Sequence, residues 1–377
     1  MRRLAAVAAA GLVALAVSVS SLSASTQQTH LQIGIYDEGV TLYGKPSTTF
    51  STYRSLHVQI VRVNLHWAAI AQRRPINAVD PNDSAYNWSL YDSAVLNARR
   101  YGIQVLLSII DTPGWENGGA GKNHAPSSSS DLRDFALAAA TRYSGTWMAT
   151  GGVHLPVVHL WGAWNEPNNP VFLTPQYKFV KGKWVNQGAI DYKNICEAIY
   201  AGVHAARVSG DKVACGLTAP RGNNNPGEPR ASVSPLAFLK AVHAAGLKHF
   251  DAWAHHPYPL SPAETPTSKL SSSTSITLGN IQTLIDQVTK YYGDKPIWIT
   301  EYGWQTKPPD PYAGVSWSKQ ASYLTQAFAI ARKNPRIQLM LWFLLRDEPN
   351  IAGWQSGLET VTGQKKPAYA AFQKLPR

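Results

Sequence analysis

Residues 157–168 read Val-Val-His-Leu-Trp-Gly-Ala-Trp-Asn-Glu-Pro-Asn, an apolar run that ends in a carboxylate and a proline. A near-continuous apolar run is typical of a strand buried on both faces of a parallel sheet. Proline cannot donate to a central ladder, so the strand is expected to end before Pro167. The pattern therefore predicts Glu166 at the carboxyl end of a buried strand, where an unpaired charge is costly. A helix cap or an ion pair is the alternative explanation.

A second stretch of the same form lies downstream. Residues 296–304 read Pro-Ile-Trp-Ile-Thr-Glu-Tyr-Gly-Trp, so an apolar strand again ends in a glutamate, Glu301, between aromatic side chains. Two such stretches favour a functional pair of carboxylates over two unrelated caps.

The rest of the chain alternates between strand and helix patterns. The expected strands are residues 31–35, 58–65, 103–110, the stretch ending in Glu166, 212–217, 250–255, the stretch ending in Glu301, and 337–343. The expected helices are residues 49–56, 88–101, 131–143, 191–208, 234–246, 278–292, 316–333 and 367–374. Eight strands that alternate with helices predict an α/β fold, a single-domain (β/α)8 TIM barrel over residues 26–377. The Gly-, Pro- and Ser-rich segments 118–130, 221–234 and 260–275 are then loops at the barrel mouth.

The first 25 residues have the pattern of a secretory signal peptide. Arg2 and Arg3 precede an apolar run from Leu4 to Val19, and small residues follow. An uncleaved anchor is the weaker interpretation, because the run is short for a membrane span. We therefore expect a secreted, extracellular protein that has no membrane span after cleavage.

The chain of 377 residues has a net charge of +12, and its basic residues are scattered rather than clustered. This distribution favours solubility, or mild attraction to an anionic surface, over nucleic-acid binding. Cys196 and Cys215 are expected on a helix and the next strand, about 10 Å apart between axes, which favours two buried thiols over a disulfide. The sequence has no Cys-x-x-Cys or His-x-x-x-His spacing, so we expect neither a metal site nor a cofactor.

On this topology Glu166 ends the fourth strand and Glu301 ends the seventh, so both face the mouth of the barrel. Two carboxylates across a cleft are what glycoside hydrolysis requires, since one must be protonated and the other ionised. The substrate would be a carbohydrate. Xylan, glucan, mannan and an acidic wall glycan all remain compatible with the composition.

Trp164-Asn165-Glu166-Pro167 resembles the acid/base motif of glycoside hydrolase clan A, the retaining (β/α)8 glycosidases. Thr300-Glu301-Tyr302-Gly303-Trp304 resembles the nucleophile strand of the same clan. Within the clan the chain is most similar to family 39 and to family 5-like enzymes. Thr112-Pro113-Gly114-Trp115 resembles their third-strand motif.

The resemblance implies a role for each matching residue. Glu166 would be the acid/base and Glu301 the nucleophile, while Asn165 would bind the sugar 2-hydroxyl. Tyr258 would donate to the nucleophile, and His256 would line the subsite or orient the acid. Two further matches are Arg62, whose charge would favour ionised Glu301, and Trp342, which would be the aromatic platform under the scissile sugar.

Other aromatic and acidic residues have less specific signals. Trp115 and Trp304 lie near strand ends and are expected to bind substrate. Trp67 is also near a strand end, whereas Trp161, Trp253 and His255 are expected to be packed. The pairs Asp37-Glu38 and Asp347-Glu348 would bind hydroxyls or form salt bridges. The alternative function is a non-catalytic carbohydrate-binding barrel, which the presence of both glutamates disfavours, and we expect a monomer.

Overall fold

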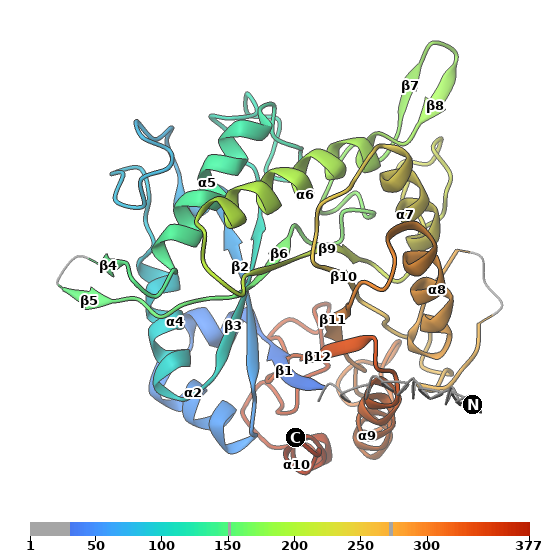
Figure 1. Cartoon of the computed structure of the whole chain (residues 1–377). Helices are drawn as coiled ribbons and strands as arrows, with labels where there is room; N and C mark the ends of the chain where they lie inside the picture. Colours follow the sequence, from blue (N-terminus) through green and yellow to red (C-terminus); the bar gives the residue numbers. More distant parts are fainter. Residues whose placement is uncertain (1–30, 150–151, 271–273) are drawn as a thin grey trace, which may run out of the picture.

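The computed structural model describes residues 31–149, 152–270 and 274–377. The predicted signal peptide, residues 1–25, lies outside this range. The described chain forms a closed barrel of eight parallel strands surrounded by helices (Figure 1). The barrel strands are β1 (Gln32–Tyr36), β2 (Ile60–His66), β3 (Gln104–Ile110), β6 (Leu160–Ala163), β9 (Lys212–Thr218), β10 (Ala252–His255), β11 (Ile297–Tyr302) and β12 (Ile337–Phe343).

The barrel closes because β12, the last strand, pairs with β1. The order around it is β1-β12-β11-β10-β9-β6-β3-β2, and each neighbouring pair is parallel. The prediction of a (β/α)8 barrel is therefore confirmed. Because all eight strands run in one direction, their carboxyl ends share one face, and the loops that follow them build the mouth.

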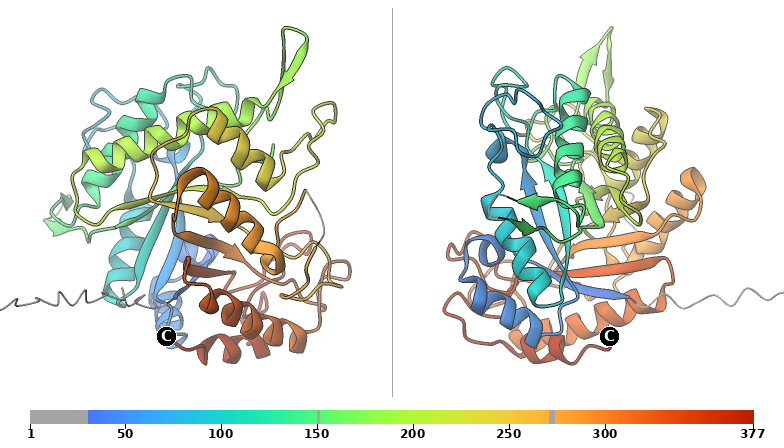
Figure 2. Two further views of the ribbon diagram at one scale, coloured as in Figure 1. Left: turned by 45° about the vertical axis from the view of Figure 1, so that its right-hand side comes forward. Right: turned by 60° about the vertical axis from the view of Figure 1, so that its left-hand side comes forward.

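Helices cover the outside of the barrel (Figure 2). The predicted helices correspond to α2 (Pro46–Ser55), α4 (Ser89–Arg100), α5 (Ser129–Arg142), α6 (Gln187–Ala205), α7 (Pro235–Ala244), α8 (Ile281–Tyr292), α9 (Trp317–Lys333) and α10 (Pro367–Gln373). Short additional elements were not predicted. They are α1 (Glu38–Tyr43), α3 (Trp67–Ile70) and the hairpins β4/β5 (Met148–Ala149, Val153–His154) and β7/β8 (Lys178–Val180, Lys183–Val185). The helix predicted over residues 278–292 begins with a 3-10 turn, η1 (Leu278–Asn280), which α8 continues.

The strands are buried on both faces, which explains their near-continuous apolar sequences. One cluster fills the barrel interior and includes Ile60, Leu106, Trp298 and Leu341. The other lies between the strands and the helices and includes Trp161, Trp253 and Trp342. The predictions that Trp161 and Trp253 are packed are thus confirmed.

The pairing of β11 with β12 is irregular near the carboxyl end of β11, where the strand reaches the mouth. Ile299 pairs with Met340 and Tyr302 pairs with Trp342, so β11 uses three residue steps where β12 uses two. One extra residue in a strand is a β-bulge, which re-aims the side chains beside it. As a result, Thr300 and Glu301 both contact groups inside the mouth.

The two cysteines are joined by a disulfide, so the expectation of two free thiols is wrong. Cys196 on α6 and Cys215 on β9 have Cα atoms 6.0 Å apart, and both residues are fully buried. The separation of axes overestimates the gap between facing residues, because the Cα atoms of a helix lie about 2.3 Å from its axis. The bridge fastens α6 to the barrel wall.

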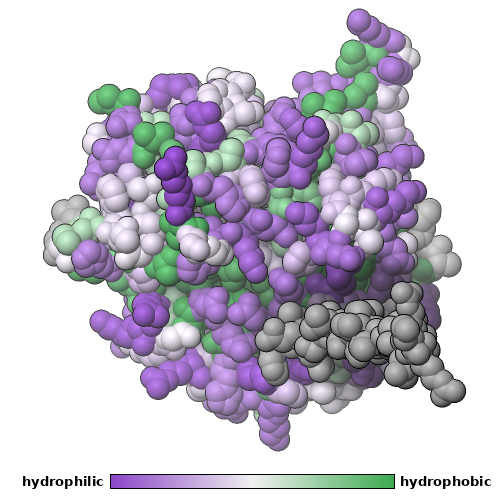
Figure 3. Space-filling view, in the orientation of Figure 1, coloured by the Kyte–Doolittle hydropathy of each residue, from purple (hydrophilic) through white to green (hydrophobic). Residues whose placement is uncertain are grey.

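The β7/β8 hairpin projects from the body of the molecule (Figures 1 and 2). Phe179 and Trp184 on it are 62% and 50% exposed and contact each other edge to face. The space-filling view shows apolar residues on this hairpin among hydrophilic ones (Figure 3). Among the described residues, no helix combines the length and apolarity that a membrane span requires.

Candidate active site

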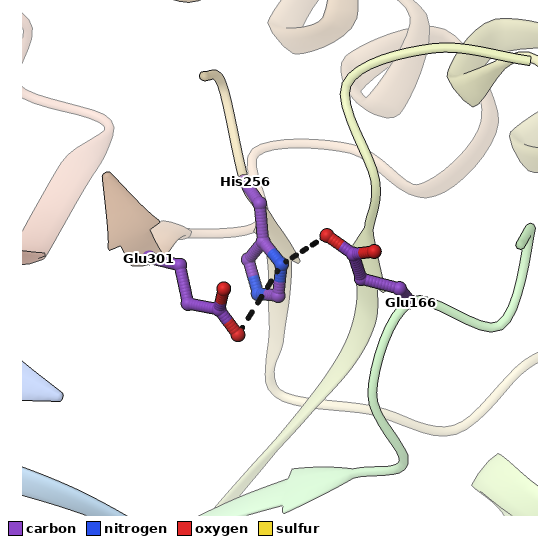
Figure 4. Close-up of side chains that lie close together, drawn as sticks. All are labelled: Glu166, His256 and Glu301. Carbon is purple, nitrogen blue, oxygen red and sulfur yellow. Dashed lines mark hydrogen bonds and ion pairs between the residues drawn. The ribbon is translucent and has the colours of Figure 1, made fainter. Parts of the chain in front are cut away.

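Three side chains meet in the centre of the mouth. Glu166 follows β6, His256 follows β10, and Glu301 lies on β11, so they come from the fourth, sixth and seventh barrel strands. His256 stands between the two glutamates (Figure 4). Its Nδ1 atom lies 3.1 Å from Glu166 Oε1 and 3.6 Å from Glu301 Oε1. An oxygen of each carboxylate and a ring nitrogen of His256 all lie within 4.8 Å of one another.

Glu166 reaches the mouth through a distorted strand end. Trp164 and Glu166 have φ angles of 70° and 38°, which lie in a backbone region that residues other than glycine seldom adopt. The Trp164 indole turns into the outer core and donates to the Phe172 carbonyl at 2.7 Å, while the Glu166 amide donates to the Leu217 carbonyl at 2.9 Å. Positive φ values of this kind cluster at functional sites, where surrounding contacts hold the strain.

Arg62 is fully buried beneath the pair and connects three strands. Its Nη1 donates to Glu301 Oε1 at 2.8 Å, and its Nη2 donates to Asn165 Oδ1 at 2.7 Å. Its Nε donates to the Ser108 hydroxyl at 3.1 Å. A Cβ at Gly162 would lie 2.5 Å from that hydroxyl, so glycine is needed there. Arg62 is thus paired with Glu301, as a buried charge requires.

The second oxygen of Glu301 accepts a hydrogen bond from the Tyr258 hydroxyl at 3.0 Å. The side chain of Glu301 is only 8% exposed. Burial and the two nearby glutamates raise the pKa of Tyr258 well above its usual range, so its hydroxyl remains a donor. Arg62 and Tyr258 together fix the carboxylate in position.

His256 is neutral at physiological pH. Burial lowers its pKa to about 3, with Glu301 opposing and Arg62 adding to the effect. Its Nε2 faces the Thr300 hydroxyl at 3.0 Å and Arg62 Nη1 at 3.4 Å. An arginine nitrogen can only donate, so Nε2 is the acceptor and Nδ1 carries the proton. That proton points towards the glutamates.

Glu166 has the protonation behaviour of an acid catalyst. Burial raises its pKa to about 7, although a hydrogen bond from Asn169 and the charge of Arg62 both oppose the rise. Asn169 Nδ2 donates to Glu166 Oε2 at 3.1 Å. Near neutral pH the group therefore exchanges readily between its protonated and ionised forms.

Trp342 lies in the outer core and does not line the mouth, contrary to the prediction of an aromatic platform. Its indole is fully buried, donates to the Ser356 carbonyl at 3.0 Å and contacts Tyr302 in the outer core. Along a strand successive side chains alternate between faces, and Leu339 and Leu341 fill the barrel interior. Trp342 therefore faces the helices, and the next residue, Phe343, faces the mouth.

The other two predicted tryptophans are also packed. Trp304 is 2% exposed and its Nε1 donates to the Tyr302 hydroxyl, so it borders the mouth without offering a ring face. Trp115 packs edge to face on Trp67 and donates to the Ala71 carbonyl, while the Arg74 guanidinium covers its ring. Trp115 therefore packs away from the described cavities, whereas Trp304 borders the cavity beside Glu166. Substrate binding by these two residues stays a prediction.

The remaining predicted residues have structural partners. His255 is buried between the Thr218 hydroxyl and the Ile276 carbonyl, as a packed histidine. Asp37 caps α1 and accepts from the amides of residues 345 and 346, and Asp347 pairs with Lys366 at 2.7 Å.

Two cavities lie at the mouth of the barrel. One of about 520 Å³ is bordered by Glu166, Tyr258 and Trp354, which is 38% exposed. The other, of about 390 Å³, is bordered by Tyr36, Asn64, His66 and Phe343. Phe343 and Trp354 contact each other edge to face and supply the aromatic surface at the mouth. Sequence patterns did not indicate Trp354, because it lies in an irregular loop after β12.

His66, at the edge of the second cavity, is clamped between two carboxylates. Its ring nitrogens lie 2.7 Å from Glu38 and 2.7 Å from Asp111. Burial opposes protonation, but these partners raise its pKa to about 9. The cavity wall therefore carries a fixed imidazolium.

Fold and site together define a (β/α)8 barrel with a carboxylate pair at the tips of its fourth and seventh strands. A family model described as "Glycosyl hydrolase catalytic core" matches residues 237–365, a range that contains His256, Tyr258 and Glu301. No curated protein sequence matches the chain.

Solved structures of glycosidases have the same fold. A family 39 glycoside hydrolase from Bacteroides cellulosilyticus WH2 matches with a TM-score of 0.63 at 19% identity, over 92% of this chain and 64% of that one. A family 39 β-xylosidase from Caulobacter crescentus gives 0.57 at 18% identity, over 92% and 71%. Fungal β-1,4-galactanases give 0.59 at 15% identity, over 92% and 100%. The chain thus spans less than two thirds of the Bacteroides protein. The predicted resemblance to clan A and family 39 is confirmed for the fold, and residues 237–365 resemble a glycosyl hydrolase catalytic core.

Proposed function

We propose that this protein is a secreted retaining glycoside hydrolase that cleaves O-glycosidic bonds of a poly- or oligosaccharide. The observation that carries the proposal is the spacing of the carboxylates, with oxygens of Glu166 and Glu301 within 4.8 Å. Retaining enzymes hold the two groups about 5–5.5 Å apart, whereas inverting enzymes need roughly 6.5–9.5 Å for a water. This spacing supports direct attack by one carboxylate.

In the first step Glu301 attacks the anomeric carbon and forms an ester bond with the sugar. The bond from that carbon to the glycosidic oxygen breaks, and protonated Glu166 gives its proton to the departing oxygen. Arg62 and Tyr258 hold Glu301 in place for the attack. The raised pKa of Glu166, about 7, supplies the proton near neutral pH.

In the second step Glu166, now ionised, takes a proton from water. The resulting hydroxide attacks the same carbon, the ester bond breaks, and Glu301 returns as a carboxylate. The charge of Arg62 favours this release, because it stabilises the ionised leaving group. The two inversions restore the original anomeric configuration.

Asn165 is suited to bind the sugar in the first step. Its Oδ1 accepts from Arg62, which orients the amide and leaves its NH2 group as the donor for a hydroxyl. Phe343 and Trp354 would pack against sugar rings, as aromatic faces commonly do.

The same trio, Glu166, His256 and Glu301, is the group of ligand-type side chains in the described part of the chain compact enough to hold a metal ion. However, the His256 nitrogen that faces the glutamates carries a proton, and Arg62 already neutralises Glu301. Hydrolysis without a metal therefore fits the trio better.

The direct test is a screen of the purified protein on nitrophenyl glycosides and polysaccharides, with NMR of the first product. We expect a product of retained configuration from at least one substrate, and none from a Glu301→Gln variant. A product of inverted configuration would contradict the nucleophile assignment. Release of the mature protein into the medium, with cleavage near residue 25, would test secretion.

A further inference from the structure

If Glu166 is the acid of the proposed mechanism, the cavity beside it is on the leaving-group side of the cleaved bond. The acid must reach the glycosidic oxygen, and Glu166 itself borders this cavity. The volume, about 520 Å³, is within the range of small-ligand sites. The group that departs, or the rest of the polymer attached to it, would therefore lie here.

This cavity has a positive wall. Arg221 and Arg230 border it, and Glu166 is the carboxylate among its described lining residues. Neither guanidinium has a hydrogen bond or ion pair within the described ranges, and both residues are exposed. Other surface arginines of the chain do have carboxylate partners, among them Arg74 with Asp131, Arg336 with Asp294 and Arg346 with Glu359.

Nearby carboxylates in the same loops contact groups other than the two arginines. Glu228 accepts from Asn225 at 3.2 Å, and Glu264 accepts from the Leu260 amide at 3.3 Å. Neither forms an ion pair with the two arginines among the described contacts. The positive charge of the wall is therefore available to a ligand.

The loop that carries the arginines is tied to the acid. Asn168, two residues after Glu166, is fully buried. Its Nδ2 donates to the Val233 carbonyl at 2.8 Å, and its Oδ1 accepts from the Ala219 amide at 2.8 Å. Asn168 thereby anchors both ends of the segment between residues 219 and 233, and fixes the positive wall relative to Glu166.

We propose that the substrate is an acidic glycan, and that Arg221 and Arg230 bind an anionic group on the leaving-group side. This inference rests on the proposed function, because it assigns the substrate class of the same site. The chemistry is a carboxylate of a uronic acid or a sulfate ester, since guanidinium pairs favourably with either. Tyr258 and Trp354 border the same cavity and supply a surface for the sugar ring.

The test is binding by a Glu301→Gln variant, which retains the shape of the site without its nucleophile. The probes are glucuronoxylan and hyaluronan, each beside its carboxyl-reduced form, and carrageenan beside its desulfated form. We expect the preferred acidic polymer to bind about tenfold tighter than its neutral counterpart, the scale of one charge-assisted hydrogen bond. Which pair shows the difference identifies a carboxylate or a sulfate. The difference should shrink as salt is raised.

The decisive variant is Arg221→Gln/Arg230→Gln, added to Glu301→Gln. It should remove the preference for the acidic polymer and leave binding of the neutral one unchanged. The matched control is Arg99→Gln/Arg100→Gln at the end of α4, which removes two exposed charges away from the described cavities. The control should preserve the preference.

Two results would overturn the inference. One is equal binding of every acidic polymer and its neutral form, and the other is an equal loss in the control variant, which would indicate the overall charge. Failure of the proposed function would give a different result from failure of this inference, because the wild-type protein would then hydrolyse no glycoside. The binding comparison is informative in either case.

Discussion

Arg62 Nη1 lies 2.8 Å from Glu301 Oε1, and neither side chain is more than 8% exposed. The pair is a buried salt bridge in which each partner also has neutral hydrogen-bond partners. In such a pair the removal of one ion leaves the other charged and without compensation. The stability and the chemistry of the mouth therefore depend on the same contact.

Arg62→Met should destabilise the protein by about 3–5 kcal/mol, because it leaves Glu301 buried and unpaired. Chemical denaturation of the variant measures the loss. The double variant Arg62→Met/Glu301→Gln should recover much of the stability and none of the activity. If the single variant is as stable as the wild type, Glu301 is not buried as an ion.

The rate should fall as pH rises through about 7, since Glu166 must be protonated in the first step. Stability should follow the same group. The pKa of Glu166 is raised in the folded protein. The stability that its protonated form contributes is therefore fully present below the unfolded value near 4.5 and is lost as pH rises through about 7. Thermal melts of wild type and Glu166→Gln across this window should converge at low pH and separate at high pH. Parallel curves would contradict the raised pKa.

Glu166→Ala should cripple turnover of substrates with poor leaving groups but spare the first step on activated aryl glycosides. Azide should then restore turnover, because a small anion can enter the space of the acid and attack the intermediate. The rescued product, a glycosyl azide, should have the configuration of the substrate. Azide should not rescue Glu301→Ala in this way, since that variant forms no intermediate.

Trp342→Ala should lower stability by about 3–5 kcal/mol, as is usual for a large buried aromatic side chain, and change kinetics little in the folded fraction. Phe343→Ala, one residue along β12, is the matched comparison. It should weaken substrate binding with a smaller loss of stability, because the ring lies at the mouth. Reversed behaviour of the two variants would mean that Trp342 contacts the sugar.

EDTA should leave activity intact, because the Nδ1 proton of His256 occupies the position that a metal ligand would need. The measurement is initial rate before and after dialysis against the chelator. Complete loss that a divalent ion restores would show that Glu166, His256 and Glu301 bind a metal.

Near-continuous apolar runs were enough to predict the eight strands and the position of the two glutamates at strand ends. The pattern was informative because a strand buried on both faces needs apolar residues along its length. Arg62 was also predictable, since a charge inside an apolar strand has few explanations other than a buried partner.

Features that depend on three-dimensional detail were not predictable. Successive strand residues lie on opposite faces, and this alternation decides that Phe343, and not Trp342, reaches the mouth. A continuous apolar strand does not show which of its residues face inward. Trp354 and Arg230 lie on irregular loops, where no sequence periodicity indicates which way a side chain points. The disulfide depended on how closely one face of α6 approaches β9.

The extra residue in β11 has a consequence for how this site tolerates change. Thr300 and Glu301 are adjacent, yet both point into the mouth because the strand is one residue longer there than its neighbour. The direction of the nucleophile is thus encoded by a count of residues and not by the identity of any one of them. Substitutions around Glu301 alter fit and charge, whereas loss of a single position would restore the regular alternation and turn the carboxylate into the helical layer. The length of β11 at this strand end is therefore as important to the site as the identity of Glu301.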